Sequence, residues 1–411
     1  MKIAVIGAKG LPAKQGGIEH YCQEIYPRMV EHGHSVDLFA RSSYIDSPWL
    51  HQYDFRGVRV ISLPCLKLRG VDALFSSLLG AIASSSPRYD IVHFHALGPA
   101  LFTCLPSIAS FSKVVVTCQG LDWRRAKWDK FSRQMLWMGE KATVRFADGI
   151  IVVSEELRSY FKKTYSRDTV YIPNAPASYP ETNANFSYGT SLGLKQGRYI
   201  LFLGRLVPEK RPDLLIQAFQ ALKPPGWKLV LVGGTSDTNS FTSHITSLAS
   251  GNPDVVFTGE LNGKYLVEIV RGAGLFVLPS DLEGLPLAML EAMREGVPVL
   301  ASNISPHQQL LAGELEIPTQ SALGARGMLF QAGNVDSCVR TLDWAIHHPT
   351  ELATMAKIAQ RYVHANHSWD QITTETLRLY KTLSTSPNIF SKSIQLSNKP
   401  AQVSEKLNSK V

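Results

Sequence analysis

Residues 276–302 read FVLPSDLEGLPLAMLEAMREGVPVLAS and contain an apolar run, a polar loop, a segment of helix length and a second apolar run. The two runs, 275–280 and 297–302, have the length of buried strands. Pro286 suits the first turn of a helix and Gly296 the position just past its end, so we expect a helix over about 286–295. The stretch therefore predicts a strand–helix–strand unit of a parallel sheet.

The same alternation extends along the chain on both sides of this stretch. One set of apolar runs predicts buried parallel strands at 2–7, 35–40, 58–63, 90–95, 113–118 and 149–154. A second set, which includes the two runs above, begins further on at 199–204, 228–233 and 255–259. Segments of helix length separate the runs. The pattern predicts an α/β protein with two doubly wound, Rossmann-like parallel sheets in sequence.

Changes in composition suggest where the domains end. We assign residues 1–178 to an N-terminal domain and 198–368 to a C-terminal domain. The polar stretch between them, 179–197, predicts a linker. Residues 369–383 have the pattern of an amphipathic helix, and 384–411 are rich in Ser, Lys and Asn, which predicts a disordered tail.

The bulk composition restricts the class of protein. A chain of 411 residues is too long for one ordinary core. Its net charge of +8 is uneven, with 22 Lys and Arg against 15 Asp and Glu in residues 1–180. This basic half suggests an anionic partner, but no zinc-finger spacing or RNA-binding aromatic signature supports nucleic acid. Five scattered cysteines without a Cys-x-x-Cys motif predict reduced thiols and a cytoplasmic location.

Two segments have features of targeting or membrane signals. The N-terminal MKIAVIGAKG has too short an apolar run for a signal peptide and predicts a buried first strand. Residues 91–112 lack Lys, Arg, Asp and Glu over about a membrane's span. They contain two histidines and two prolines, however, so we expect a strand, a loop and a helix there.

The loop after the first strand, GAKGLPAKQGGIEHY (7–21), places Gly16 and Gly17 where a helix begins. Glycines let backbone N–H groups approach a phosphate, and a helix N-terminus favours negative charge. A nicotinamide dinucleotide site is the alternative, but it requires Gly-x-Gly-x-x-Gly, and no acid follows the second strand. A glycine loop that serves only as a turn is a further alternative.

His93 and His95 lie on one face at the C-terminal end of a predicted strand, where open α/β sheets place their ligands. We expect a catalytic or substrate-binding role for His95, and less so for His93. The alternatives are two satisfied core histidines, or metal ligands, for which no third ligand of suitable spacing is visible.

Two cations follow the strand at 199–204. In GRLVPEKRPDLL, Arg205 leaves the strand and Lys210 precedes a helix. A planar guanidinium and a compact ammonium at such a strand exit suit a diphosphate. The alternative is a pair of solvated charges on a loop.

The opening stretch adds two acids to the same region. Glu283 belongs to the loop and Glu291 to the helix flank, because Pro286 begins the helix between them. Glu283 is then placed to meet the reacting end of a ligand, and Glu291 to reach hydroxyls such as those of a ribose. The backbone N–H groups of Gly284 and Leu285 are expected to face the same site.

Together these motifs resemble the retaining glycosyltransferases of the GT-B fold, specifically glycosyltransferase family four. The resemblance covers about residues 1–383 and rests on Glu-x7-Glu from Glu283, on GRLVPEK (204–210), on IPN (172–174) and on the Gly16–Gly17 loop. It implies an acceptor-side N-terminal domain facing a nucleotide-sugar domain across a cleft, with 369–383 packing back on the first domain.

The resemblance also implies roles for individual residues. Arg205 and Lys210 would bind the donor diphosphate, Glu291 the ribose, and Glu283 the donor sugar near its reacting carbon. His95 looks like the histidine beside that sugar. The EGLP loop is shorter than the EGFGLP of many members, which leaves the sugar contacts open.

A finer resemblance is to bacterial sugar-transferases of surface polysaccharide assembly, rhamnosyltransferases among them. It rests on HFHALG (93–98), QGLDWRRAKW (119–128) and KGLPAKQGGIE (9–19). The acceptor would be a glycan or a lipid-linked sugar. No Asp-x-Asp occurs in the chain, so we expect no metal cofactor. Attack on the same face of the sugar, with the departing phosphate accepting the proton, is the mechanism that we expect.

Residues 122–146 are predicted to form one helix that mixes tryptophans with Arg and Lys. Such a helix suits peripheral contact with an anionic membrane, although its aromatics could instead pack on its own sheet. Three other functions stay open: a nucleotide-sugar epimerase of the same fold, a non-catalytic sugar-nucleotide sensor and an NAD(P)-binding protein.

Overall fold

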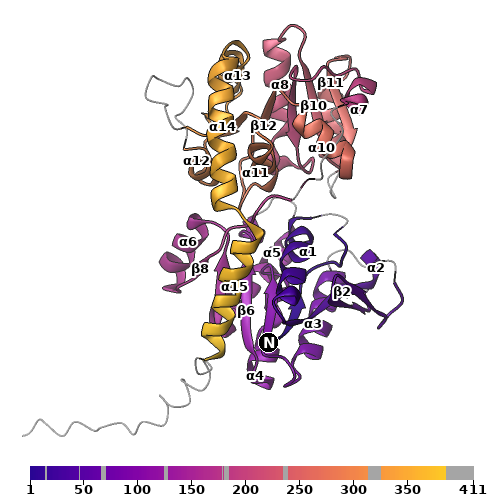
Figure 1. The fold of residues 1–411 in the computed structure, drawn as a ribbon, viewed down its shortest axis with the longest axis vertical. Coiled ribbons are helices and arrows are strands. Elements are labelled where there is room, and N and C mark those ends of the chain that lie inside the picture. The colour runs from indigo at the N-terminus through magenta and orange to yellow at the C-terminus, as the bar shows by residue number, and fades with distance from the viewer. Residues whose placement is uncertain are drawn as a thin grey trace, which may run out of the picture.

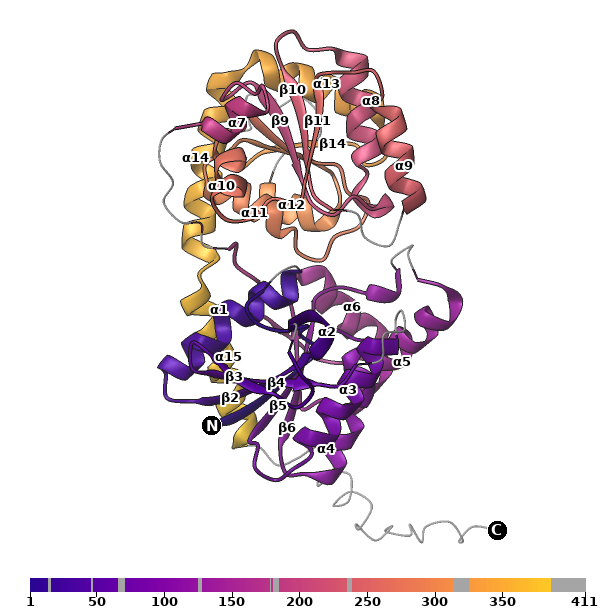
Figure 2. The ribbon, with the colours of Figure 1, turned by 90° about the vertical axis from the view of Figure 1, so that its right-hand side faces the viewer.

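The protein is described by a computed structural model that covers residues 1–13, 16–45, 47–65, 71–124, 128–177, 179, 185–234, 239–312 and 325–385. Within these ranges the chain forms two lobes, each built around one parallel sheet with helices on both faces (Figure 1). The second view shows the long final helices running along one side of both lobes (Figure 2).

The first sheet has eight strands in the order β3-β4-β2-β1-β5-β6-β7-β8. Its strands are β1 (Lys2–Ile6), β2 (Ser35–Arg41), β3 (Gln52–Phe55), β4 (Val58–Leu63), β5 (Ile91–His95), β6 (Lys113–Cys118), β7 (Gly149–Val152) and β8 (Val170–Tyr171). All neighbours pair in parallel except β3, which forms an antiparallel edge on β4. The six predicted strands of this half are confirmed.

The second sheet has six strands in the order β11-β10-β9-β12-β13-β14. They are β9 (Tyr199–Leu203), β10 (Lys228–Val232), β11 (Val255–Gly259), β12 (Leu275–Leu278), β13 (Val299–Ser302) and β14 (Met328–Phe330). In both sheets the strand order reverses beside the first strand, between β1 and β5 and between β9 and β12. Open α/β sheets bind ligands at this point, beyond the carboxyl ends of the strands.

Helices cover the faces of both sheets. Those of the first half are α1 (Gly17–Glu31), α2 (Ser42–Ile45), α3 (Val71–Ser84), η1 (Pro99–Phe102), α4 (Cys104–Ala109), η2 (Asp122–Arg124), α5 (Lys130–Phe146) and α6 (Glu155–Tyr165). Those of the second half are α7 (Ser187–Ser191), η3 (Pro208–Lys210), α8 (Pro212–Leu222), α9 (Asn239–Leu248), α10 (Gly263–Arg271), α11 (Leu287–Arg294), α12 (Ser305–Leu311), α13 (Val335–His347) and α14 (Pro349–Asn366).

The last helix, α15 (Trp369–Ser384), returns to the first sheet. Four of its side chains, Trp369, Ile372, Leu377 and Tyr380, belong to the same apolar core as strand β1 and helix α1. Tyr380 also makes a hydrogen bond of 2.6 Å to His93 of β5. The chain therefore passes between the domains twice, once near residue 175 and again near residue 367.

Several local predictions need refinement. The expected helix over 122–146 is wrong: η2 ends at Arg124 and α5 begins at Lys130, where the Asp129 side chain caps it by accepting from the Ser132 N–H. Within the predicted linker, α7 packs on the second domain, since Gly189 N–H donates to Glu268. The stretch 91–112 forms a strand, a turn and a helix, as expected. Of the predicted tail, residues 386–411 lie outside the described residues.

No helix among the described residues is both long and apolar enough to cross a membrane. The five cysteines are free thiols, in agreement with the expectation from the sequence.

Candidate active site

The reversal of strand order in the second sheet brings two charged groups together. Lys210 follows β9 at the end of η3, and Glu283 follows β12. Because β9 and β12 are neighbours, both side chains lie at the same edge of the sheet. Lys210 Nζ is 2.7 Å from Glu283 Oε1, and both side chains are largely buried, at 16% and 10% exposure.

Glu283 is held from its own loop as well. The Ser280 hydroxyl donates to Glu283 Oε1 at 2.7 Å. Burial raises the pKa of Glu283, but Lys210, His307 and the hydrogen bonds outweigh it, so the pKa lies below its usual value of 4.5. Glu283 is therefore a carboxylate at neutral pH, and one of the three N–H donors of Lys210 is committed to it.

Behind this pair lies His307, in α12, which the sequence reasoning missed. The side chain is fully buried, and its Nδ1 is 2.8 Å from the Ser302 carbonyl oxygen, which accepts only. Ser302 in turn donates its hydroxyl to the Ser280 carbonyl. Burial lowers the His307 pKa to about 4, so the ring is neutral at pH 7. The chain Ser280–Ser302–His307 thus braces the loop that carries Glu283.

Glu291 lies on the flank of α11 in a different environment. Its Oε2 accepts a hydrogen bond of 2.8 Å from the Tyr179 hydroxyl. Burial raises its pKa, and the hydrogen bond from Tyr179 and the charge of Arg294 offset this only in part. The structure thus separates the two acids of Glu-x7-Glu into an ion-paired loop residue and a carboxylate that contacts the connection between the domains.

The glycine loop of the first domain approaches the same helix. Gly17, the first residue of α1, would place a Cβ 3.2 Å from Leu287 at the start of α11. Gly16 has a positive φ of 97°, and a Cβ there would collide with the Glu19 carboxylate at 2.2 Å. Glu19 also accepts from the Lys9 N–H at 2.9 Å, which braces the loop. The loop therefore faces the second domain, next to the EGLPLAMLE segment.

A second contact joins the domains at Gly284. A Cβ on this residue would lie 2.1 Å from the carbonyl oxygen of Gln119, so only glycine permits the approach. Leu285 packs against the cores of both domains. Whether the N–H groups of Gly284 and Leu285 meet a ligand stays a prediction.

Gln119 is another residue that the sequence reasoning did not assign. It directly follows β6, and its Oε1 lies 2.7 Å from Nδ2 of Asn174. Gln119 Nε2 and Asn174 Oδ1 are both buried without a hydrogen-bond partner. If the two amides are flipped, one N–H group and one carbonyl are again left over. The position of Gln119 at a strand exit is the signal that could have identified it.

The structure places His95 away from solvent, in the core of the first domain. It has no exposed surface, and its Nε2 is 2.6 Å from the Tyr26 hydroxyl. Burial lowers its pKa to about 3. His93 bonds Tyr380 and Thr117 in the same core. His95 Nδ1 is buried without a hydrogen-bond partner, and the expected contact of His95 with a donor sugar stays a prediction.

Arg205 lies between β9 and η3, at the strand exit where the sequence places it. Its expected contact with a diphosphate stays a prediction. Among the residues that the structure describes, no three His, Cys, Asp or Glu side chains come together as a metal-binding group.

Two Rossmann-like domains in tandem, joined by a returning C-terminal helix, define the GT-B class of fold. Two family models match the chain, "Glycosyltransferase Family 4" over residues 15–175 and "Glycosyl transferases group 1" over residues 190–362. The chain is therefore a GT-B glycosyltransferase, composed of a family 4 domain followed by a group 1 domain.

Relatives of similar length match most of the chain. The chain is 28% identical to a D-inositol 3-phosphate glycosyltransferase of Gordonia bronchialis, with 92% of this chain and 88% of the relative covered. It is 24% identical to an uncharacterised glycosyltransferase of Methanocaldococcus jannaschii, with 93% and 98% covered.

Solved structures show the same fold. Sucrose-phosphate synthase of Thermosynechococcus elongatus matches with a TM-score of 0.77 at 21% identity, covering 93% of this chain and 98% of that one. HepE of Anabaena, in complex with UDP-glucose, matches with a TM-score of 0.73 at 18% identity, covering 93% and 100%.

Proposed function

We propose that the protein transfers a hexosyl-type sugar from a nucleoside-diphosphate sugar to a glycan or lipid-linked acceptor, with retention of configuration. The observation that carries the proposal is the Lys210–Glu283 pair at the strand-order reversal of the second sheet. Solved relatives of this fold bind UDP-glucose or ADP, which agrees with a nucleotide-sugar donor.

The chemistry requires stabilisation of the leaving diphosphate more than a strong nucleophile. As the bond from sugar to phosphate lengthens, negative charge collects on the diphosphate and positive charge on the sugar. Lys210 keeps two N–H donors for the diphosphate while the third holds Glu283. Arg205, at the same strand exit, adds a planar cation. Cations held in place in a partly dry site stabilise the charge of the leaving diphosphate without the reorientation that water molecules would need.

Glu283 is the anionic group beside the reacting carbon in this proposal. As a carboxylate it stabilises an oxocarbenium-like sugar, and its bond to Lys210 keeps it ionised despite burial. Retention follows from same-face attack, in which the departing phosphate takes the proton of the acceptor hydroxyl. The configuration of the product, read by NMR from the anomeric coupling at early times, tests this step. An inverted product would refute it.

A panel of UDP, ADP, GDP and dTDP in calorimetry, followed by the sugar derivatives of the tightest binder, identifies the donor. Incubation with the donor but no acceptor separates the transferase from the epimerase, which alone would convert the sugar. Activity that persists in excess EDTA is the expected result for a reaction without a metal. Loss of activity in EDTA, with recovery on adding Mg²⁺, would contradict that expectation.

The face formed by α4 and α5 supports the proposal of a lipid-linked acceptor and a peripheral membrane location on the cytoplasmic side. Exposed apolar side chains lie on α5, Phe131 at 69% and Met138 at 44%, and in the segment at the end of α4, Ile108 at 66% and Phe111 at 89%. Exposed Lys130, Arg133, Lys141 and Arg145 lie on the same helix, α5. The buried side of α5 is instead formed by Gly139, Glu140 and Thr143, so most of its aromatics do not pack on the sheet.

Pelleting with vesicles tests the membrane contact. The protein should sediment with vesicles that contain an anionic lipid and stay in solution with neutral ones, because both basic charge and apolar area contribute. The double variant F131S/M138S should lose most of the binding. Tyr265→Ser, which removes a comparably exposed aromatic from the second domain, is the control. Equal recovery of the wild type in both supernatants would refute the proposal.

A surface-polysaccharide pathway, with a rhamnosyl donor, is the finer form of this proposal. The activity with dTDP-linked and UDP-linked sugars in the panel distinguishes it from transfer of a glucosyl group.

A further inference from the structure

The segment that connects the two domains contacts the proposed ribose-binding acid directly. Tyr179, in this connection, donates its hydroxyl to Glu291 Oε2 at 2.8 Å. The backbone N–H of Ala177 also bonds the Glu291 carboxylate, and this contact lowers the pKa of the group. Two donors from one short segment therefore hold one carboxylate of α11.

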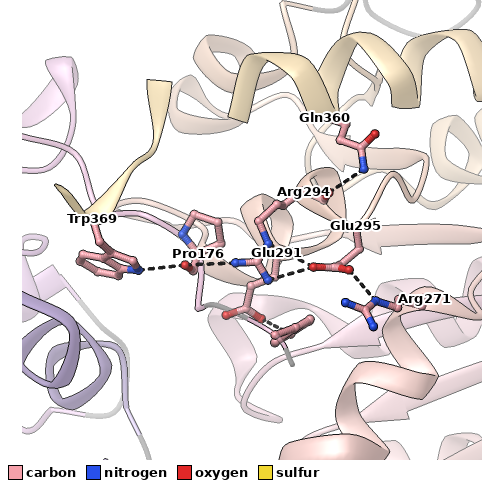
Figure 3. A network of polar contacts seen from close by, with 8 residues as sticks. Pro176, Arg271, Glu291, Arg294, Glu295, Gln360 and Trp369 are labelled. Carbon is pink, nitrogen blue, oxygen red and sulfur yellow. Dashed lines mark hydrogen bonds and ion pairs between the residues drawn. The ribbon is translucent and has the colours of Figure 1, made fainter. Parts of the chain in front are cut away.

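The same segment is fixed from several sides (Figure 3). The Arg294 guanidinium lies over the Tyr179 ring, 5.0 Å from its centre. Trp369 Nε1 donates to the Pro176 carbonyl at 3.0 Å, and Arg294 Nη1 lies 3.5 Å from the same oxygen. Arg294 is held in turn by Glu295 at 2.9 Å. The position of Tyr179 is thus defined by both crossings between the domains.

The lone pairs of Glu291 leave room for a ligand beside Tyr179. A carboxylate offers about four acceptor positions, and Tyr179 and Ala177 occupy two of them. The pair of hydroxyls on a ribose could use the remaining two. A tyrosine that fixes one oxygen reduces the side-chain freedom that nucleotide binding would otherwise have to remove.

We propose that Tyr179 is a positioning residue of the donor site, which orients Glu291 for the ribose hydroxyls and makes the interdomain connection part of nucleotide recognition. The inference rests on the proposed function, in which Glu291 binds the ribose. It goes beyond it because Tyr179 lies in the connection rather than in either sheet domain. Nucleotide binding should then tighten the connection itself.

Calorimetry with whichever of the ribonucleotides UDP, ADP and GDP binds most tightly, and with its 2′,3′-dideoxy form, tests the inference. Tyr179→Phe keeps the ring over Arg294 and removes only the hydroxyl. It should weaken binding of the ribonucleotide by about 3- to 10-fold, since a hydrogen bond to a charged group is lost. Its affinity for the dideoxy form should stay within about twofold of the wild type, because no ribose hydroxyl is then present to be oriented.

Three further comparisons decide how each result of the calorimetry is interpreted. Tyr188→Phe, which removes a hydroxyl from a ring of α7 that packs on Tyr265 of α10, is the matched control and should bind like the wild type. If Tyr179→Phe weakens both nucleotides equally, or tightens binding, the positioning role is refuted while the donor site stands. If Glu291→Gln and the dideoxy form both leave the affinity unchanged, the ribose role of Glu291 fails, and the inference fails with it.

Hydrogen exchange at Ala177 provides an independent measurement. Its amide is the donor to Glu291, so the ribonucleotide should slow its exchange and the dideoxy form should not. Equal protection by both nucleotides would contradict the coupling.

Discussion

The two sheets reverse their strand order at equivalent places, yet the two reversal points differ in chemistry. In the first sheet, β5 ends in His93 and His95, which bond tyrosines and are buried as neutral rings. In the second sheet, β9 and β12 lead to Lys210 and Glu283, an ion pair at the edge of the sheet. Equivalent topology thus provides two places where a ligand could bind, and the side chains decide which one presents charge.

The largest expected effect concerns the charged reversal point. Lys210→Ala should lower kcat about 10²- to 10³-fold, because it removes a fixed cation from the leaving diphosphate. Thermal stability should change much less than activity. Lys195→Ala, which removes an exposed lysine shortly before β9, is the control. Wild-type turnover in Lys210→Ala would show that the charged pair is only structural, and the contrast between the sheets would lose its functional meaning.

A smaller effect concerns the stability that the pair provides. Glu283→Gln should lower the free energy of unfolding by about 1–3 kcal/mol at pH 7, since it leaves Lys210 largely buried without a counter-charge. The wild-type contribution of Glu283 should be present above pH 4.5 and lost as the pH falls through its lowered pKa. Urea unfolding at pH 7 and pH 4 measures both. Equal loss at the two pH values would contradict the ion-pair account.

His95 of the first sheet should also make the free energy of unfolding fall as the pH falls, but beginning at a higher pH than Glu283. The pKa of His95 is lowered to about 3, so below pH 6.5 the unfolded chain takes up a proton that the native protein does not. Stability should therefore fall with falling pH by up to about 1.4 kcal/mol per unit for this residue. His95→Gln should make the decline between pH 6 and pH 4 shallower. The kcat of the folded variant at pH 7 tests the expected contact of His95 with the donor sugar, and wild-type turnover would refute that contact.

The smallest effect on the free energy of unfolding is expected for substitution of Glu291, and it should be opposite in sign to that of Glu283. Its raised pKa means that the folded state favours the protonated form, so ionisation of the buried carboxylate reduces stability as the pH rises through that pKa. Glu291→Gln should then raise the free energy of unfolding at pH 7, while it weakens nucleotide binding. A loss of stability equal to that of Glu283→Gln would show that the two acids have the same structural role.

The fold was largely predictable from the sequence because buried parallel strands leave apolar runs that are easy to find. The strands that escaped detection are short: β3 has four residues, β8 has two and β14 has three. The helix over 122–146 was predicted as continuous because basic and aromatic residues run through it. The sequence pattern did not show that Asp129 caps a new helix after η2.

Only part of the candidate site could be predicted from the sequence. Lys210 and Glu283 could be paired from the rule that ligands bind at strand ends, and the structure confirms that they meet. His95 follows the same rule, but the rule does not show that Tyr26 and the returning helix α15 cover the strand end. Gln119, Asn174 and Tyr179 depend on contacts between segments far apart in the sequence, which a linear pattern does not encode.

The returning helix α15 has a consequence for biosynthesis. Tyr380, Leu377, Ile372 and Trp369 complete a core whose other members, such as Ile3 and Val5, all lie much earlier in the chain. Met1 and Ser384 even lie side by side, with the Ser384 hydroxyl 4.0 Å from the Met1 sulfur. The N-terminal domain therefore stays incomplete until α15 has been translated. The C-terminal domain, although made later, has all its strands available before its neighbour can close.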